Sequence, residues 1–253
     1  MSNNELSNKV AVVTGGADGI GEGIARIFWG YGAQVVIADI EEEKGEALAA
    51  ELGGNASFVL LDVTDPGGWN NLVAELKSNP GRLDILVNNA GGGGFGNLNQ
   101  LTIEEWRKIM ALNMDSVFLG CKTAAALLQA DGGGSIINIS STNANRAWSM
   151  FSGYCSAKAG MTMFSKCVAQ HFLEMNANVR CNTVHPGPIE TPNFKRLSAA
   201  EGADQLMADW QKNNPFTEIG TVEDIAEVVA FLASDEARYV NASEFVAAGG
   251  TLL

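Results

Sequence analysis

Residues 10–21 read VAVVTGGADGIG, an apolar β-branched run that passes directly into a glycine-rich turn. The run Val10–Val13 predicts a strand buried on both faces, and the helical pattern Ile20–Tyr31 follows at once. Glycines at a strand-to-helix junction let the backbone approach an anion closely, and the free N–H groups at the helix start carry partial positive charge. The stretch therefore predicts a phosphate-binding turn. Its residues are Gly15, Asp18, Gly19, Ile20 and Gly21.

The same alternation of short β-branched runs and longer helical patterns continues along the chain, with no repeat and no linker. The predicted strands are Val10–Val13, Gln34–Ala38, Ala56–Leu61, Ile85–Asn88, Ser135–Ile139, Val179–Val184 and Glu244–Ala247. The predicted helices are Ile20–Tyr31, Glu41–Leu52, Gly67–Ser78, Ile103–Gln129, Gly153–Met175 and Val222–Ala233. Such alternation requires right-handed crossovers. We expect one α/β domain over residues 1–253: a Rossmann-type, doubly wound parallel sheet of about seven strands with helices on both faces.

Composition narrows the range of partners. The chain has 16 Lys and Arg against 29 Asp and Glu, a formal net charge of −13. A nucleic-acid binder or a protein of anionic membranes needs a positive face, so neither partner is expected.

The polar start MSNNELSNK is not a secretory signal, and no apolar run is long enough to span a bilayer. The four cysteines have no C-x-x-C spacing, and His171 and His185 are isolated and interpreted as structural. We expect a cytoplasmic protein with no metal site.

Asp39 ends the second predicted strand, about twenty residues past the glycine turn, where an acid can accept hydrogen bonds from an adenosine ribose. A 2′-phosphate would meet a repelling carboxylate there. No Lys or Arg follows at once, because the next residues are Ile40 and then Glu41–Glu43. Asp39 therefore favours NAD(H) over NADP(H). The alternative is a solvated acid that opens the next helix.

Tyr154 and Lys158 form a Y-x-x-x-K pattern, and residues four apart share a helix face. A nearby ammonium favours the phenolate form, so the pair is suited to proton transfer near neutral pH. Ser141 follows a predicted buried strand and can hydrogen-bond a substrate oxygen while Tyr154 exchanges its proton. The alternatives are a surface Tyr–Lys pair and ordinary capping at a strand end.

Two helix starts and one loop segment complete the local signals. Thr102 stands three residues before Glu105, the spacing of a capping box, and Thr221 precedes Glu223 and Asp224. The Asn193–Trp210 segment is polar, Ala-rich and weakly periodic. It predicts a mobile helical lid over a substrate, at about residues 190–212.

These motifs together resemble the short-chain dehydrogenase/reductase family over essentially the whole chain. TGGADGIG is similar to its cofactor loop, Asn88–Gly91 to its N-N-A-G motif, and Pro186-Gly187 followed by Thr191 to its nicotinamide-side motif. Residues 179–187 and 231–236 are most similar to NAD-dependent secondary-alcohol and hydroxysteroid dehydrogenases of bacteria, which are usually homotetramers.

The resemblance implies roles for individual residues. Tyr154 would be the general acid/base, and Lys158 would lower its pKa and hold the nicotinamide ribose. Ser141 would position the substrate oxygen, and Asn113 would hold a water in a proton relay from Lys158. The implied cofactor contacts, beyond the glycine turn, are Asp39, Ile40, Asp62, Val63, Asn89, Ala90, Gly91, Tyr154, Lys158, Pro186, Gly187, Ile189 and Thr191.

The implied reaction moves a hydride between NAD(H) and a hydrophobic secondary alcohol or ketone in a homotetramer. The expected substrate pocket is formed by Gly92–Phe95, Thr142–Phe151, Pro188 and the lid, and its walls are apolar. The apolar side chains are Trp148, Met150, Phe151, Phe194, Met207 and Trp210. Ala248 departs from the family, which commonly has Asp before Gly-Gly. Two alternatives stay open: an acyl-carrier-protein ketoreductase, and a non-catalytic NAD-sensing protein.

Overall fold

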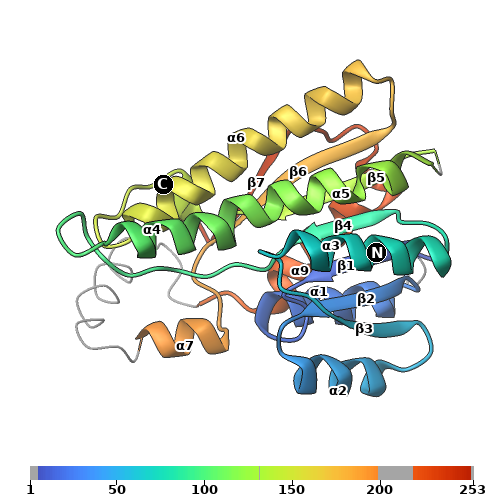
Figure 1. Cartoon of the computed structure of the whole chain (residues 1–253), viewed down its shortest axis with the longest axis horizontal. Helices are drawn as coiled ribbons and strands as arrows, with labels where there is room; N and C mark the ends of the chain where they lie inside the picture. The colour runs from blue at the N-terminus through green and yellow to red at the C-terminus, as the bar shows by residue number, and fades with distance from the viewer. Residues whose placement is uncertain (1–4, 131, 199–218, 252–253) are drawn as a thin grey trace.

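The computed structural model describes residues 5–130, 132–198 and 219–251. The predicted strands form one parallel sheet in the order β3-β2-β1-β4-β5-β6-β7 (Figure 1). The strands are β1 (Val10–Thr14), β2 (Gln34–Asp39), β3 (Ala56–Leu60), β4 (Ile85–Asn88), β5 (Gly134–Ile139), β6 (Val179–Pro186) and β7 (Glu244–Ala247). The predicted fold class is therefore confirmed.

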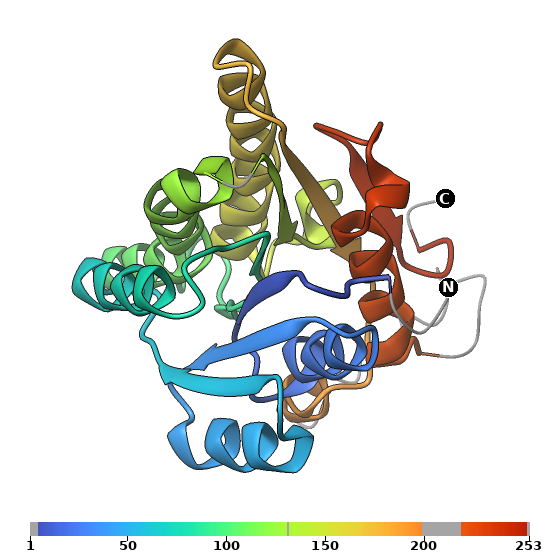
Figure 2. The ribbon, with the colours of Figure 1, turned by 90° about the vertical axis from the view of Figure 1, so that its right-hand side faces the viewer.

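Helices cover both faces of this sheet, as Figure 2 shows. The helices α1 (Gly19–Gly30), α2 (Glu42–Leu52) and α9 (Val222–Ala233) pack on one face, and α3 (Pro66–Ser78), α5 (Ser116–Ala130) and α6 (Ser152–Glu174) on the other. Successive strand residues point to opposite faces, so Val13 joins the first core and Val12 the second. The central strands β1, β2 and β4 are buried on both faces, which explains why they read as nearly unbroken apolar runs.

The strand order reverses between β1 and β4, so the chain leaves their carboxyl ends in opposite directions. Thr14 joins the two strand ends. Its hydroxyl accepts hydrogen bonds from the backbone N–H groups of Asn89 (3.0 Å) and Ala90 (3.1 Å). This edge of the sheet is where a doubly wound fold binds ligands.

The long predicted helix Ile103–Gln129 is interrupted. The chain forms α4 (Ile103–Met110), a π-helical turn η1 (Ala111–Asp115) and then α5. The expected capping box at Thr102 with Glu105 is confirmed, and Thr221, where acids in the first turn were expected, forms a second capping box with Asp224. A π turn fits one more residue into the helix than the α-helical repeat allows, and such turns are frequent at functional sites.

The expected lid lies only partly within the described residues. Its first part is α7 (Pro192–Ser198), which Figure 1 places beyond the carboxyl ends of the strands, on the same side as α4. Met207 and Trp210 lie outside the described residues. No helix in the described ranges is both long and apolar enough to cross a membrane.

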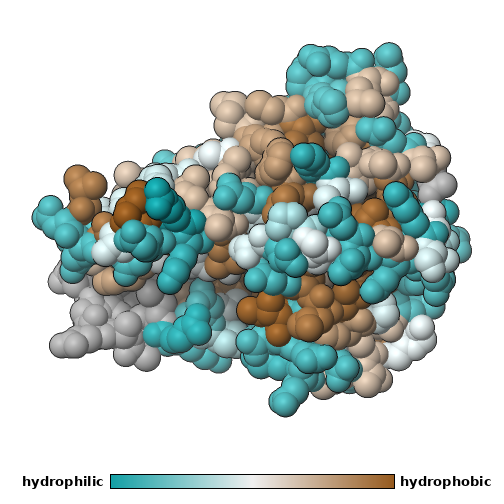
Figure 3. Space-filling model, viewed as in Figure 1, coloured by the Kyte–Doolittle hydropathy of each residue, from teal (hydrophilic) through white to brown (hydrophobic). Residues whose placement is uncertain are grey.

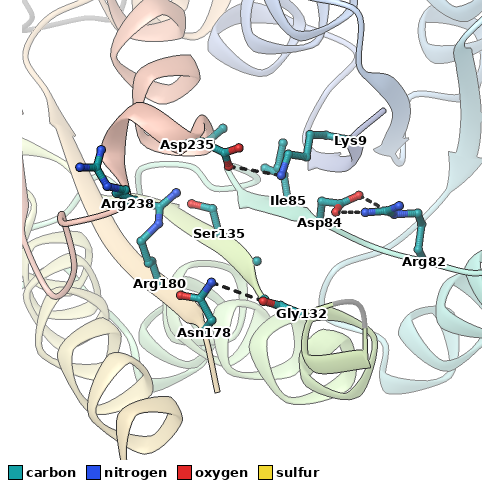
Figure 4. A pocket seen from close by; sticks show the side chains of 13 residues that line it. Lys9, Arg82, Asp84, Ile85, Gly132, Ser135, Asn178, Arg180, Asp235 and Arg238 are labelled. Carbon is teal, nitrogen blue, oxygen red and sulfur yellow. Dashed lines mark hydrogen bonds and ion pairs between the residues drawn. The ribbon is translucent and has the colours of Figure 1, made fainter. Parts of the chain in front are cut away.

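At the opposite edge, the amino ends of β1, β4, β5 and β6 border a polar pocket of about 160 Å³ (Figure 4). Lys9 pairs with Asp235 at 3.3 Å, and Arg82 pairs with Asp84. Arg180 donates to the Ser234 carbonyl at 3.1 Å, where α9 ends, a favourable place for a cation. These contacts join neighbouring segments at the amino edge of the sheet, and this pocket lies far from the carboxyl edge.

The edge strand β3 carries apolar side chains in a groove between α2 and α3. Figure 3 shows this apolar area with hydrophilic side chains around it. The carboxylates of Glu42, Glu46 and Glu75 form part of its border. Charged residues at a sheet edge discourage pairing with strands of other molecules.

Candidate active site

The glycine turn lies directly against the segment that follows β4. Gly15 and Gly19 have left-handed φ angles of +61° and +56°, which glycine adopts without strain. A Cβ atom on Gly15 would lie 2.9 Å from the Cα of Ala90, so the backbone there has no room for a side chain. Asn89 donates its side-chain amide to the carbonyls of Thr14 (2.9 Å) and Gly15 (3.0 Å). Asn89 thus fixes the shape of the turn, a role that the sequence did not indicate.

Asp39 stands beside this turn, as its place in the sequence indicated. Its carboxylate is almost fully buried and accepts hydrogen bonds from the N–H groups of Ala17 (2.9 Å) and Glu41 (3.1 Å). A cation that the sequence analysis missed is close by, because Lys44 of α2 pairs with Asp18 of the turn at 2.8 Å. Ile40 is well exposed next to Asp39.

The four expected catalytic residues come together from three elements. Tyr154 and Lys158 lie on α6, Ser141 follows β5, and Asn113 lies in the π turn η1. The Ser141 hydroxyl is hydrogen-bonded to the Tyr154 phenol. The Lys158 Nζ lies over the Tyr154 ring, 5.6 Å from its centroid.

The Asn113 and Lys158 side chains both reach the backbone at Gly91. A Cβ atom on Gly91 would lie 2.9 Å from Asn113 Oδ1 and 3.3 Å from Lys158 Nζ. Asn113 is fully buried, and its amide donates to the carbonyls of Ile109 (3.0 Å) and Gly92 (2.9 Å). The π turn therefore holds the Asn113 side chain against the glycine segment after β4.

Burial dominates the electrostatics of the Tyr154–Lys158 pair. Desolvation raises the pKa of Tyr154 to about 12, and the hydrogen bond from Ser141 opposes this rise. Desolvation lowers the pKa of Lys158 to about 7, and its Nζ donates to the Ile139 carbonyl at 2.8 Å. The sequence predicted a phenol pKa lowered by the ammonium, whereas here it rises. The reason is that burial disfavours the charged phenolate form, and the Lys158 Nζ lies over the Tyr154 ring.

The remaining expected cofactor contacts lie at the same edge of the sheet. Pro186 ends β6, Gly187 donates to the Ala247 carbonyl at 3.1 Å, and Thr191 lies against Gly19. Ile189 is buried and forms a bridge with Gly220.

Two further contacts lie after β3. Asp62 is exposed, and its carboxylate accepts from the N–H of Thr64 at 2.8 Å. Val63 is buried, and its carbonyl accepts from Trp69.

The expected substrate pocket is partly occupied by packing. Phe151 is buried and meets Phe95 edge to face, with ring centroids 5.5 Å apart. Trp148 stacks under the Arg146 guanidinium at 5.1 Å. Phe95 remains largely exposed, so it is free to contact a substrate.

One buried side chain at this site escaped the sequence analysis as a functional residue. His185 of β6 is fully buried, and its Nδ1 lies 3.1 Å from the Ser141 carbonyl oxygen. The two residues are 44 positions apart and the contact crosses between strands, so no local pattern signals it.

Known proteins resemble the chain along nearly its whole length. A family model described as enoyl-(acyl carrier protein) reductase matches residues 15–251. The 2,5-dichloro-2,5-cyclohexadiene-1,4-diol dehydrogenase of Sphingobium indicum is 38% identical over 98% of this chain and 97% of its own. An NADP-dependent (R)-specific alcohol dehydrogenase of Lentilactobacillus kefiri is 38% identical over 97% of each chain.

The structural comparison agrees with these relatives. A crystal structure of a short-chain dehydrogenase/reductase from Burkholderia xenovorans superimposes with a TM-score of 0.92 at 36% identity, and the match covers 98% of both chains. The family resemblance seen in the motifs is confirmed over both sequence and fold. The chain belongs to the short-chain dehydrogenase/reductase family of oxidoreductases.

Proposed function

We propose that the protein is an NAD(H)-dependent dehydrogenase or reductase that acts on a hydrophobic secondary alcohol or ketone. The observation that carries this proposal is the meeting of Ser141, Tyr154, Lys158 and Asn113 beside the glycine turn. Relatives from two bacteria are named as dehydrogenases of a cyclic diol and of alcohols, which supports the substrate class.

The residues present fit a nicotinamide dinucleotide. The turn at Gly15 and Gly19 exposes backbone at the start of α1, which suits a pyrophosphate, and Asp39 suits the adenosine ribose. When bound, the dinucleotide supplies the hydride acceptor or donor. Lys158, Asn89–Gly91, Pro186–Ile189 and Thr191 would hold its nicotinamide half.

The chain's own groups handle the proton. In ketone reduction the Tyr154 phenol, which its raised pKa keeps protonated, donates its proton to the substrate oxygen, while Ser141 hydrogen-bonds that oxygen and orients it. Lys158, whose pKa of about 7 lets it gain and lose a proton at neutral pH, resupplies or removes that proton. Asn113 lies beside Lys158 and extends the path.

The acids around the ribose position favour NAD(H). Asp39 and Asp18 are both carboxylates, and a 2′-phosphate would be repelled by them. Lys44 is already paired with Asp18. The Lentilactobacillus relative is named NADP-dependent, so coenzyme choice varies among similar proteins and a direct comparison is decisive.

The first test is Tyr154→Phe, assayed with NAD+ and a panel of secondary alcohols. We expect turnover to fall by about 10²–10⁴-fold, because the proton acceptor is gone. NADH binding, measured by fluorescence, should persist. Tyr239→Phe is the matched control, since Tyr239 is 99% exposed and far from the proton path. Unchanged turnover in Tyr154→Phe would contradict the proposal.

The second test compares kcat/KM for NADH and NADPH in the wild type and in Asp39→Ala. The wild type should prefer NADH, and the variant should lose that preference.

Lys158→Ala should lose rate and weaken NADH binding together. A strong preference for NADPH, with turnover of acyl thioesters, would favour the acyl-carrier-protein reductase. NADH binding without any turnover would favour the NAD-sensing protein.

The proposal includes a homotetramer in a reducing cytoplasm. Met161 is fully buried in the core, whereas Met163 of α6 and Phe118 of α5 are 59% and 42% exposed and are available for subunit contact. The four cysteines all lie in the described ranges and are free thiols, as a reducing compartment allows. Sedimentation of wild type and Met163→Glu tests the assembly.

A further inference from the structure

His185 is the buried titratable side chain that the proposed mechanism leaves unused. It lies on β6 with no exposed surface. Its Nδ1 lies 3.1 Å from the Ser141 carbonyl oxygen, and its Nε2 lies 2.9 Å from the Thr183 hydroxyl. A carbonyl oxygen only accepts, so Nδ1 carries the proton. In the neutral ring Nε2 accepts from the Thr183 hydroxyl, whose other acceptor, the Ser243 carbonyl, is more distant at 3.4 Å. We propose that His185, as its neutral Nδ1–H tautomer, is a positioning residue that fixes the catalytic Ser141.

The charged groups around the ring are compatible with the neutral form. Glu244 of β7 has a carboxylate oxygen 3.8 Å from Nε2, but that carboxylate is engaged by Lys166 at 2.7 Å and by Asn145. Burial lowers the pKa of His185, the charges of Lys158 and Lys166 lower it further, and Glu244 and the Ser141 carbonyl oppose them. The ring is therefore neutral at the pH of an ordinary assay.

The position of Ser141 explains why such an anchor matters. Ser140 still donates to the Val184 carbonyl at 2.7 Å, as a sheet residue does, but Ser141 has left the ladder. Its hydroxyl accepts from the Asn143 N–H at 3.1 Å and is hydrogen-bonded to Tyr154. His185 thus ties the backbone of Ser141 to β6 at the point where β5 has ended.

The consequence for catalysis is geometric. Catalytic groups must hold their places within fractions of an ångström, and their supporting hydrogen bonds set that precision. Without the His185 donor, the Ser141 carbonyl keeps its bond from the Ala144 N–H, so the turn persists but its tether to β6 is lost. This inference rests on the proposed roles of Ser141 and Tyr154.

Three substitutions of His185 distinguish a role in positioning Ser141 from a role in packing alone. His185→Asn places an amide donor where Nδ1 lies, His185→Gln places its amide nearer Nε2, and His185→Phe fills the space without a donor. We expect kcat to fall roughly ten-fold in the Gln and Phe variants, with the Kd for NADH unchanged. The pH profile of kcat should also shift, because Ser141 no longer hydrogen-bonds Tyr154 well. The Asn variant should recover most of the rate.

The exposed His171 provides the matched control, and His171→Gln should behave as wild type. Wild-type kcat and pH profile in His185→Phe, or an Asn variant as poor as Phe, would overturn the proposal. A rate loss with failed NADH binding in every variant would also overturn it, since it would show a folding role only.

A second measurement needs no variant of His185. The chain has only two histidines, so 15N NMR of the imidazoles is readily assigned with His171→Gln. We expect the neutral Nδ1–H tautomer for His185 at pH 7. An Nε2–H tautomer or an imidazolium would overturn the proposal even if His185→Phe does not fold. Bound NADH without wild-type turnover would instead contradict the proposed function, and the positioning role would fall with it.

Discussion

At Gly91 the backbone passes so close to Asn113 and Lys158, two of the proposed catalytic residues, that one methyl group has no room. The position of its absent Cβ lies within 3.3 Å of both Asn113 Oδ1 and Lys158 Nζ. Asn113 and Lys158 are buried; the Asn113 Oδ1 accepts from the Gly92 N–H and the Lys158 Nζ donates to the Ile139 carbonyl, so neither atom can move aside freely. The glycine is required here by close approach, because Gly91 does not have a left-handed backbone.

Gly91→Ala should therefore reduce both activity and stability. Overpacking typically costs about 1–3 kcal/mol, and displacement of Lys158 and Asn113 should lower kcat at least about ten-fold. Urea unfolding and steady-state kinetics measure the two effects. Gly30→Ala in α1 is the control, because nothing lies within 4 Å of its Cβ position. Wild-type kcat in Gly91→Ala would contradict the packing seen here.

Lys158 makes stability depend on pH. Its pKa is about 7 in the folded chain against the 10.5 of an unburied lysine, so the folded state releases a proton that the unfolded state keeps. The stability of the fold therefore rises between about pH 7 and pH 10. Below about pH 7 Lys158 is protonated in the folded state as well, so the full cost of burying its ammonium lowers the stability of the fold.

Lys158→Met should accordingly raise the free energy of unfolding at pH 6, and this gain should shrink as the pH approaches about 10. Urea titrations at both pH values measure it, with the exposed Lys108→Met as control. A gain that does not change with pH would show that the lysine charge is not the cause.

Among the elements, the strands and the central helix break show what a sequence pattern reveals. Each strand was located to within two residues, and for central strands such as β1 and β4 the reason is that burial on both faces leaves an unbroken apolar run. The prediction of one continuous helix over Ile103–Gln129 was wrong. The extra residue of the π turn does not alter the apolar pattern of the sequence enough to be seen. Yet this turn carries Asn113, the residue that the motif comparison singled out.

The candidate site divides in the same way. Residues in local motifs, such as Tyr154 with Lys158, were predicted from their spacing together with Ser141 and the resemblance to the family. Contacts between distant segments could not be predicted in this way. The contacts of Lys44 with Asp18 and of His185 with Ser141 depend on how α2 and β6 are placed in space. Desolvation of Tyr154 was missed for the same reason, because burial is a property of the whole fold.

Helix α4 leads into the π turn that carries Asn113. We expect the cap at the start of α4 to affect the stability of the fold more than the rate of turnover. Thr102→Ala removes the hydroxyl that accepts from the Glu105 N–H and should cost about 1 kcal/mol of unfolding free energy. We expect kcat to change little, since Asn113 is held separately by Ile109 and Gly92. Thr123→Ala within α5 is the control and should cost less. A large fall in kcat would show that α4 positions Asn113.

For the molecule as a whole, the cysteines report on global unfolding. Burial raises the pKa of Cys121 to about 12 and raises that of Cys181 well above its ordinary value, and both thiols lie in the core under α3, α5 and α6. Cys167 is exposed on α6.

A thiol reagent at pH 7.5 should therefore label Cys167 rapidly and Cys121 and Cys181 only as the protein unfolds. Mass spectrometry over time measures this, and Cys167→Ser should remove the rapid phase. NADH at 100 times its Kd should slow labelling of the two core thiols by about 100-fold if only the folded state binds it. Rapid labelling of Cys181 in the native protein would show that this core opens locally.

The two edges of the parallel sheet matter for anyone who immobilises or tags this protein. Lys9 enters β1 at the edge that carries the ion pairs of Figure 4, whereas Ala248 follows β7 at the opposite edge and touches Gly187. Thr251 is already anchored back on Ala248. A solid support or fluorescent fusion joined ahead of Leu6 is therefore held away from the proposed active site, while one joined beyond Thr251 starts next to Gly187, in the segment that we propose to hold the nicotinamide.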